Sequence, residues 1–480
     1  MSVLDLVLRI AVVIAGVALP PMSVFGAPAS SDPVKTGLQQ CQARDFGRSV
    51  KSLSAAVKIK PNDPVLWTCL AESNAALGRP ELAVKDYKKS LALNADDPLG
   101  WFELGSIYVT LHADQKAISS YRRGLALDPM NQMANRIYAL LLFENGQFQE
   151  ALRWLRAALA GEPNNKKLAS ALIMSLLKTK KTVEADQQIR QFSSTSSVEE
   201  RTELTRDLLK EMQFQRAFPI LEELVKTDPT FAEAHAQLGL LFLEEQHYED
   251  SVWEIGQAVQ LEPASSKYSL ELSEALLRWH HYSTALDFLS SVSSRFGDLV
   301  GFQYDLAYAH YGMRQYESSI SIVTKLLEHH PGNAAAEFLL GNCYTAVGNY
   351  PAAEKHLAEA IRVEPSKPAY YLVMAQVAGY QGKTEESERS IRRGLAIDPQ
   401  DSSLLLESAS RRESAGDLKG AAQILEGLVT KDPASIQAHR LLARIYWRLG
   451  KKAEAREEGK YASLEAQSEV VEPRQRNREK

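Results

Sequence analysis

The sequence predicts an all-α solenoid made of about thirteen helix-turn-helix units, and three observations lead to this fold class. A period of 34 residues runs along most of the chain, small residues occupy two fixed positions of each period, and glycine and proline recur at two further positions. A period of this length is interpreted before any local motif because it determines the architecture of the whole chain.

The period becomes visible when the sequence is written in rows of 34 residues from Ser30. One two-residue deletion, before Val198, interrupts the spacing, and the last eight rows then keep an unbroken register. The thirteen rows begin at Ser30, Pro64, Pro98, Gln132, Lys166, Val198, Ala232, Ser266, Val300, Ala334, Pro368, Ser402 and Ile436.

Each row contains two amphipathic segments that are predicted to be helices. Row position 20 is Ala or Ser in all thirteen rows, as in Ala353, and position 8 is Gly, Ala or Ser in eleven of them. Small residues at fixed places indicate where two helix axes approach closely. Larger apolar residues such as Trp101, Leu104 and Tyr108 recur at three- and four-residue intervals, which is the period of an amphipathic helix.

Glycine and proline separate these segments. Position 15 is often Gly, as in Gly78 and Gly348, which suits the end of the first helix. Proline at position 32 closes nine rows, as in Pro129, and stops the second helix before the next row begins.

The row that begins at Pro98 resembles the tetratricopeptide repeat. Its segment Trp101-Phe-Glu-Leu104-Gly105-Ser-Ile-Tyr108, followed by Ala117, Tyr121 and Pro129, is similar to the repeat pattern of that family almost throughout. The resemblance covers residues 30–469 and implies a right-handed superhelical solenoid that binds other proteins. Residues 166–197 depart most from the pattern, because Ile173 replaces a small residue and a serine-rich stretch replaces the closing proline. We expect an irregular joint there.

The two ends of the chain do not follow the period. Arg9 precedes an apolar stretch of ten residues, and Ala27-Pro28-Ala29 offers a cleavage signal, so residues 1–29 are predicted to be a signal peptide. The protein is then exported to the periplasm or the extracellular space, with no stable membrane span after cleavage; the alternative is an uncleaved N-terminal anchor. Residues 470–480 form a polar tail that is predicted to be disordered.

Composition and motifs argue against catalysis and cofactor binding. The net charge of −5 carries no basic excess that would indicate a nucleic-acid partner. The sequence contains no HExxH, G-x-S-x-G or phosphate-binding loop motif, so we expect no catalytic residue, no cofactor and no metal. The histidine pairs His280-His281 and His329-His330 do not change this, because adjacent helical residues point about 100° apart.

The three cysteines lack the C-x-x-C spacing of a zinc or thioredoxin-like centre. Cys41 and Cys69 could form a disulfide between neighbouring rows if the chain is exported. Three independent buried thiols, with Cys343 as the third, are the preferred interpretation.

The family resemblance implies that positions 2, 5, 9, 12 and 13 of each first helix line a concave groove. The richest stretch of this groove is aromatic and amide-bearing, and tyrosines suit an interface because they combine a large contact area with a polar tip. The candidate partner-binding residues there are Tyr304, Tyr308, Tyr311, Phe338, Asn342, Gln376 and Tyr380. The alternative is that some of these rings pack sideways between neighbouring helices.

A second candidate cluster lies in the last row and comprises Arg440, Arg444, Trp447 and Arg448. These side chains would form a basic, aromatic-flanked patch suited to an acidic segment. The alternative is an end surface in which Trp447 packs under the final helix.

The predicted function is a non-catalytic scaffold that binds protein or peptide segments in its groove. Two alternatives stay open: a glycan- or polymer-binding protein of the cell envelope, and a non-catalytic subunit of an enzyme complex. The residues leave the partner and the oligomeric state open.

Overall fold

The computed structural model describes residues 32–464. The predicted signal peptide, residues 1–29, and the predicted polar tail, residues 470–480, lie outside the described residues. The described part of the chain contains helices and no strand, so the predicted all-α solenoid is confirmed.

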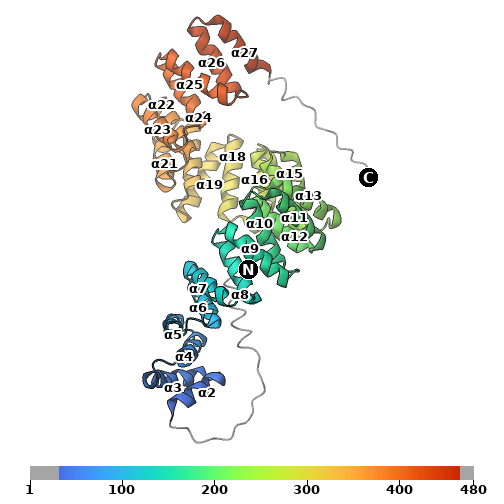
Figure 1. Cartoon of the computed structure of the whole chain (residues 1–480). Coiled ribbons are helices and arrows are strands. Elements are labelled where there is room, and N and C mark those ends of the chain that lie inside the picture. Colours follow the sequence, from blue (N-terminus) through green and yellow to red (C-terminus); the bar gives the residue numbers. More distant parts are fainter. Residues whose placement is uncertain (1–31, 465–480) are drawn as a thin grey trace. The chain divides into compact units, whose positions relative to one another are not determined.

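Within residues 32–464 the helices form thirteen successive hairpins, which Figure 1 colours in chain order. They divide into two compact units, one ending at Pro229 and the other beginning at Thr230. The helices of the first unit are α2 (Pro33–Gln42), α3 (Phe46–Ile59), α4 (Pro64–Ala76), α5 (Pro80–Leu93), α6 (Pro98–Thr110), α7 (Asp114–Leu127), α8 (Gln132–Glu144), α9 (Phe148–Gly161), α10 (Lys166–Lys178), α11 (Thr182–Thr195), α12 (Val198–Lys210) and α13 (Phe214–Thr227).

The second unit continues the same alternation of a first and a second helix. Its helices are α14 (Ala232–Glu244), α15 (Tyr248–Leu261), α16 (Ser266–Arg278), α17 (Tyr282–Phe296), α18 (Val300–Gly312), α19 (Tyr316–His329), α20 (Ala334–Ala346), α21 (Tyr350–Val363), α22 (Pro368–Tyr380), α23 (Thr384–Ile397), α24 (Ser402–Ser414), α25 (Leu418–Lys431), α26 (Ile436–Arg448) and α27 (Lys452–Leu464).

The first helix of twelve hairpins begins at the residue that begins a row, and only α2 starts later, at Pro33. The stretch with the weakest repeat pattern forms the regular helices α10 and α11. Ser197 then takes the place of the closing proline and starts α12 with a capping box, in which its hydroxyl accepts from the Glu200 N–H and its own N–H donates to the Glu200 carboxylate.

The two columns of small residues lie where the two helices of a hairpin cross. All thirteen residues at position 20 are buried, and twelve of them have no exposed surface. A Cβ atom on Gly105 would lie 2.8 Å from the Tyr121 ring, and one on Gly341 would lie 2.7 Å from the Leu357 side chain. The large residue of the second helix therefore fills the space that the small residue of the first helix leaves.

The turn inside every hairpin places position 15 in the left-handed region, with φ between 53° and 83°. Glycine occupies this position in six hairpins and adopts the conformation at no steric cost. Seven hairpins use another residue there, at a local cost of about 1–2 kcal/mol. These residues are Arg44, His112, Lys180, Met212, Gln246, His280 and Arg314.

One hydrogen bond recurs along the chain. It links a first helix to the turn that precedes this helix. The side chain at position 4 donates to the carbonyl oxygen of the residue six places earlier, as the Trp67 indole does to Pro61 at 2.8 Å. Five other first helices make the same bond through their own side chain at position 4, and these donors are Trp101, Asn135, Gln303, Tyr371 and His439. The bond satisfies a turn carbonyl that would otherwise need water.

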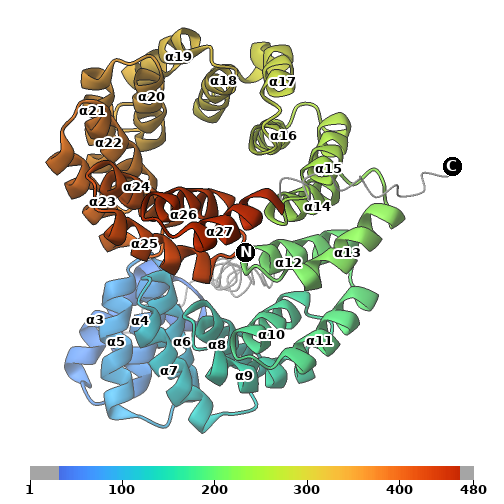
Figure 2. The same ribbon diagram turned by 90° about the horizontal axis from the view of Figure 1, so that it is seen from above.

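In the second unit the first helices lie side by side. Each first helix from α14 to α26 contacts the next first helix, and Figure 2 shows that these even-numbered helices line the inner side of the unit. None of the helices within residues 32–464 is both long and apolar enough to cross a bilayer.

Candidate functional site

The inner side of α22, α24 and α26 carries an open hollow of about 400 Å³. Its walls come from row positions 2, 5, 6 and 9, which include three of the positions that the family resemblance assigns to the groove. The lining residues are Leu372, Gln376, Ser403, Leu406, Glu407, Ser410, Gln437, Arg440, Leu441 and Arg444. The hollow thus brings Gln376 from one predicted cluster together with Arg440 and Arg444 from the other.

Half of the lining consists of polar side chains that have no partner in the described part of the chain. Within residues 32–464, none of these five side chains donates or accepts a hydrogen bond or forms an ion pair: Gln376, Ser403, Ser410, Gln437 and Arg440. Three leucines stand between them, one from each helix. The hollow therefore offers both apolar contact and unused donors and acceptors, which is the composition of a ligand site.

The predicted basic cluster divides into one cation without an ion pair in the described chain and two that share a single carboxylate. The Glu413 carboxylate accepts two hydrogen bonds from Arg444, at 3.1 and 2.7 Å, and one from Arg448, at 3.0 Å. Burial alone would raise the pKa of Glu413, but these hydrogen bonds outweigh it and lower that pKa. Arg440 is exposed and forms no such pair within the described chain. Trp447 is 58% exposed, and the Lys452 ammonium lies 5.7 Å from its ring centre.

A second ion pair shapes the wall between α22 and α24. The Arg411 guanidinium donates to the Glu407 carboxylate at 2.6 Å on the same helix. A Cβ atom on Gly379 would lie 2.1 Å from that guanidinium, so the glycine leaves the space in which Arg411 lies. The Glu407 charge is thereby compensated, and Arg440 is the lining cation without a compensating carboxylate in the described part of the chain.

The predicted tyrosines form a continuous row of rings on α18. Tyr304 stacks on Tyr308 with ring centres 6.2 Å apart, and Tyr308 lies 6.1 Å from Tyr311. Burial raises the pKa of Tyr304 to about 12. All three rings are half-buried against the core, so only part of each ring faces outward.

Two tyrosines from second helices extend this row, and sequence reasoning missed both. Tyr282 of α17 lies 6.3 Å from Tyr308, and Tyr316 of α19 lies 5.7 Å from Tyr311. A Cβ atom on Gly312 would lie 2.3 Å from the Tyr282 ring, so this glycine was the available signal for a ring packed against α18.

The remaining candidates lie on α20 and α22, between the tyrosine row and the hollow. The half-buried Phe338 ring lies 4.6 Å from the Tyr370 ring and belongs to the packing between these helices. Asn342 is half-buried and makes no hydrogen bond within residues 32–464. Tyr380 is 60% exposed and stacks on Tyr350 at 5.5 Å.

Two sequence families match parts of the chain. The tetratricopeptide repeat family matches residues 70–129 and 102–166. The cilia and flagella-associated protein 70 C-terminal domain matches residues 305–477.

Individual relatives are distant. The TPR repeat-containing protein YpiA of Bacillus subtilis (strain 168) is 20% identical over 48% of this chain and 55% of its own length. The DnaJ protein P58IPK homolog A of Oryza sativa subsp. japonica is 22% identical over 40% of this chain and 46% of its own length. The chain thus spans about half the length of these curated relatives.

Solved structures that resemble the chain include the APC/C hetero-tetramer Cut9-Hcn1, which covers 92% of this chain and 95% of its own, with 14% identity and a TM-score of 0.41. A thermophilic TPR protein of Thermus thermophilus, TTC0263, covers 38% of this chain and 98% of its own, with 19% identity and a TM-score of 0.35. The tetratricopeptide repeat family matches residues 70–166. Together with the 34-residue period and the helix hairpins of residues 32–464, this match leads to one conclusion: the described part of the chain is a solenoid of tetratricopeptide-type repeats.

Proposed function

We propose that this chain is a non-catalytic scaffold that binds a segment of a partner protein in the hollow of α22, α24 and α26, with a carboxylate of that segment on Arg440. The observation that carries the proposal is the set of five unpartnered polar side chains around the hollow. Polar groups without a partner are the ones that gain most from a ligand, because no internal bond has to be broken first.

The mixture of side chains suits an extended peptide. The amides of Gln376 and Gln437 each offer a donor and an acceptor, as a peptide backbone requires. The leucines at positions 5 and 6, including Leu406, provide apolar contact for alternate side chains of such a segment.

Charge indicates which peptide binds best. Within residues 32–464, the guanidinium of Arg440 has no counter-charge. Arg411 pairs with Glu407, and Arg444 shares the carboxylate of Glu413 with a second arginine. A charge-assisted hydrogen bond from Arg440 to a carboxylate contributes about 1.5–3 kcal/mol, which corresponds to about ten- to a hundredfold in affinity.

The test uses the full chain and an array of twelve-residue peptides that differ in the number and position of acidic residues. We expect acidic peptides with apolar neighbours to bind, and Arg440→Glu to weaken the best of them by about ten- to a hundredfold. The matched control is Arg392→Glu, which makes the same charge change at an exposed position of the second helix α23. Equal losses in both variants, or binding that ignores peptide charge, would refute the proposal.

A glycan array under the same conditions tests the alternative ligand. Tyr380 is the most exposed ring of the predicted groove and would be the stacking platform. Glycan binding that is lost in Tyr380→Ala and kept in Arg440→Glu would favour the alternative over the peptide.

We also propose that the chain acts in the cell envelope after removal of residues 1–29. The apolar stretch after Arg9 and the small residues around Ala29 support this. N-terminal sequencing of the protein recovered from an envelope fraction checks it, and a chain that still begins at Met1 would contradict cleavage.

A further inference from the structure

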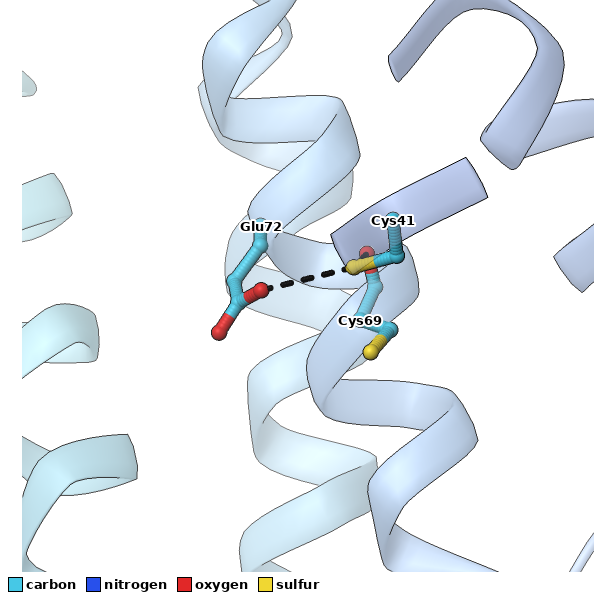
Figure 3. Close-up of side chains that lie close together, drawn as sticks. All are labelled: Cys41, Cys69 and Glu72. Atoms are coloured by element: carbon cyan, nitrogen blue, oxygen red, sulfur yellow. Dashed lines mark hydrogen bonds between the residues drawn. The ribbon is translucent and has the colours of Figure 1, made fainter. Parts of the chain in front are cut away.

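Cys41, Cys69 and Glu72 converge in the first unit, far along the chain from the hollow. Figure 3 shows Cys41 on α2 and the other two side chains on the neighbouring helix α4. Their sulfur and carboxylate oxygen atoms all lie within 4.8 Å of one another. The Cys41 sulfur lies 3.5 Å from Glu72 Oε2 and 3.7 Å from the Cys69 carbonyl oxygen.

The repeat geometry explains why these residues meet. Cys69 and Glu72 are three residues apart on α4, so both lie on one face of that helix. Cys41 is in the last turn of α2, and α2 contacts α4 as its neighbouring first helix. All three residues lie in helices, so only changes of side-chain rotamer are needed for them to share one ligand.

The geometry points to Zn²⁺ as that ligand. Thiolate sulfur binds zinc at about 2.3 Å and carboxylate oxygen at about 2.0 Å, so a tetrahedral ion places these two atoms about 3.5 Å apart. The Cys41 sulfur and the Glu72 oxygen already have that separation. Two thiolates on the same ion are about 3.8 Å apart, which is within the span of the cluster. Thiolate donors select zinc over magnesium and calcium, which prefer oxygen.

The charge of the cluster also favours a cation. Within residues 32–464, no lysine, arginine or histidine pairs with Glu72, and its one hydrogen-bond partner is the Cys41 thiol. Glu413, by contrast, is held by two arginines. A divalent ion supplies the positive charge that the protein does not place beside Glu72.

We infer that Cys41, Cys69 and Glu72 bind one Zn²⁺ ion, with a solvent molecule in the fourth position. Cys41 is buried, Cys69 is half-buried and Glu72 is exposed, so the carboxylate side of the site faces solvent. The ion would join the first two hairpins of the solenoid. A disulfide between Cys41 and Cys69 is the competing use of the same sulfurs, and it would leave Glu72 without a role.

The experiment titrates the untagged, reduced, metal-free full chain with Zn²⁺ and with Co²⁺ as a spectroscopic probe. We expect one ion per chain and a thiolate-to-cobalt charge-transfer band. Cys41→Ser and Cys69→Ser should each weaken the band by about half or more, because only one of the two thiolates remains. Cys343→Ser should keep it, because Cys343 is buried elsewhere and its thiol lies 3.2 Å from the Ser319 hydroxyl.

Glu72→Gln separates the carboxylate from the thiols. It should keep the charge-transfer band and weaken Zn²⁺ affinity by about tenfold or more. Circular dichroism shows whether each variant keeps its helices. Three outcomes would overturn the inference: no binding by the reduced chain, unchanged binding in either serine variant, or peptide mapping that finds Cys41 and Cys69 joined by a disulfide in the purified protein.

Discussion

Replacing Ala353 with leucine tests whether the small residues at row position 20 lie at a helix crossing that has no free space. Ala353 has no exposed surface and belongs to a buried cluster with Leu357 and Val377. If the crossing had room, three additional buried carbons would stabilise the protein by about 2 kcal/mol. Because a Cβ atom on the facing Gly341 would already lie 2.7 Å from Leu357, we expect overpacking to dominate. Ala353→Leu should therefore destabilise the protein by about 1–3 kcal/mol.

The assay is urea denaturation followed by circular dichroism, with Ala358→Leu as the control. Ala358 lies in the same helix, α21, and is exposed, so the control adds the same carbons without entering the crossing. Hydrogen exchange of α20 and α21 locates the loss, since the hairpins of a solenoid need not unfold together. Equal midpoints for the two variants, or a more stable Ala353→Leu protein, would refute the packing argument.

Two further predictions concern an acid and a hydrogen bond. Burial raises the pKa of Asp305 to about 6, although a hydrogen bond from Ser273 opposes the shift. The protonated Asp305 carboxyl therefore contributes to the free energy of unfolding below about pH 4, and this contribution is lost as pH rises through about 6. Asp305→Asn should then stabilise the protein by up to about 2–3 kcal/mol at pH 7 and not at pH 4, and urea midpoints that shift equally at both pH values would contradict this. Trp101→Phe removes the 2.9 Å bond to the Ala95 carbonyl and should cost about 1 kcal/mol in thermal denaturation, whereas Trp447→Phe, whose indole makes no such bond in the described chain, should cost less.

The fold could be predicted because a solenoid repeats one local solution. The small residues at position 20 and the prolines at position 32 each carry little information alone, yet thirteen aligned rows place almost every first helix to the residue. Residue type predicts the left-handed turns in only about half of the hairpins. Gly78 signals such a turn by its residue type, whereas Arg44 and Met212 do not, and only the alignment of rows identifies them.

The candidate site was predictable in outline because row position decides which side chains face inward. Gln376, Arg440 and Arg444 line the hollow as that register implies. The ion pair of Arg444 with Glu413 was not predictable from the row of Arg444, because Glu413 lies 31 residues earlier in the preceding hairpin. The cysteine cluster could not be predicted from the sequence for the same reason. Metal ligands are usually sought at short spacings within one loop, whereas Cys41 and Cys69 are 28 residues apart and meet through neighbouring helices.

The bond from position 4 to the preceding turn gives the stack a direction. The donor always belongs to the later hairpin and the acceptor to the turn before it, as with Tyr371 and Pro365. A hairpin that opens at the carboxyl-terminal end therefore releases the turn behind it, whereas one that opens at the amino-terminal end leaves the next donor in a helix that is still folded. Unfolding should thus begin more readily at the carboxyl-terminal end of such an array than at its amino-terminal end.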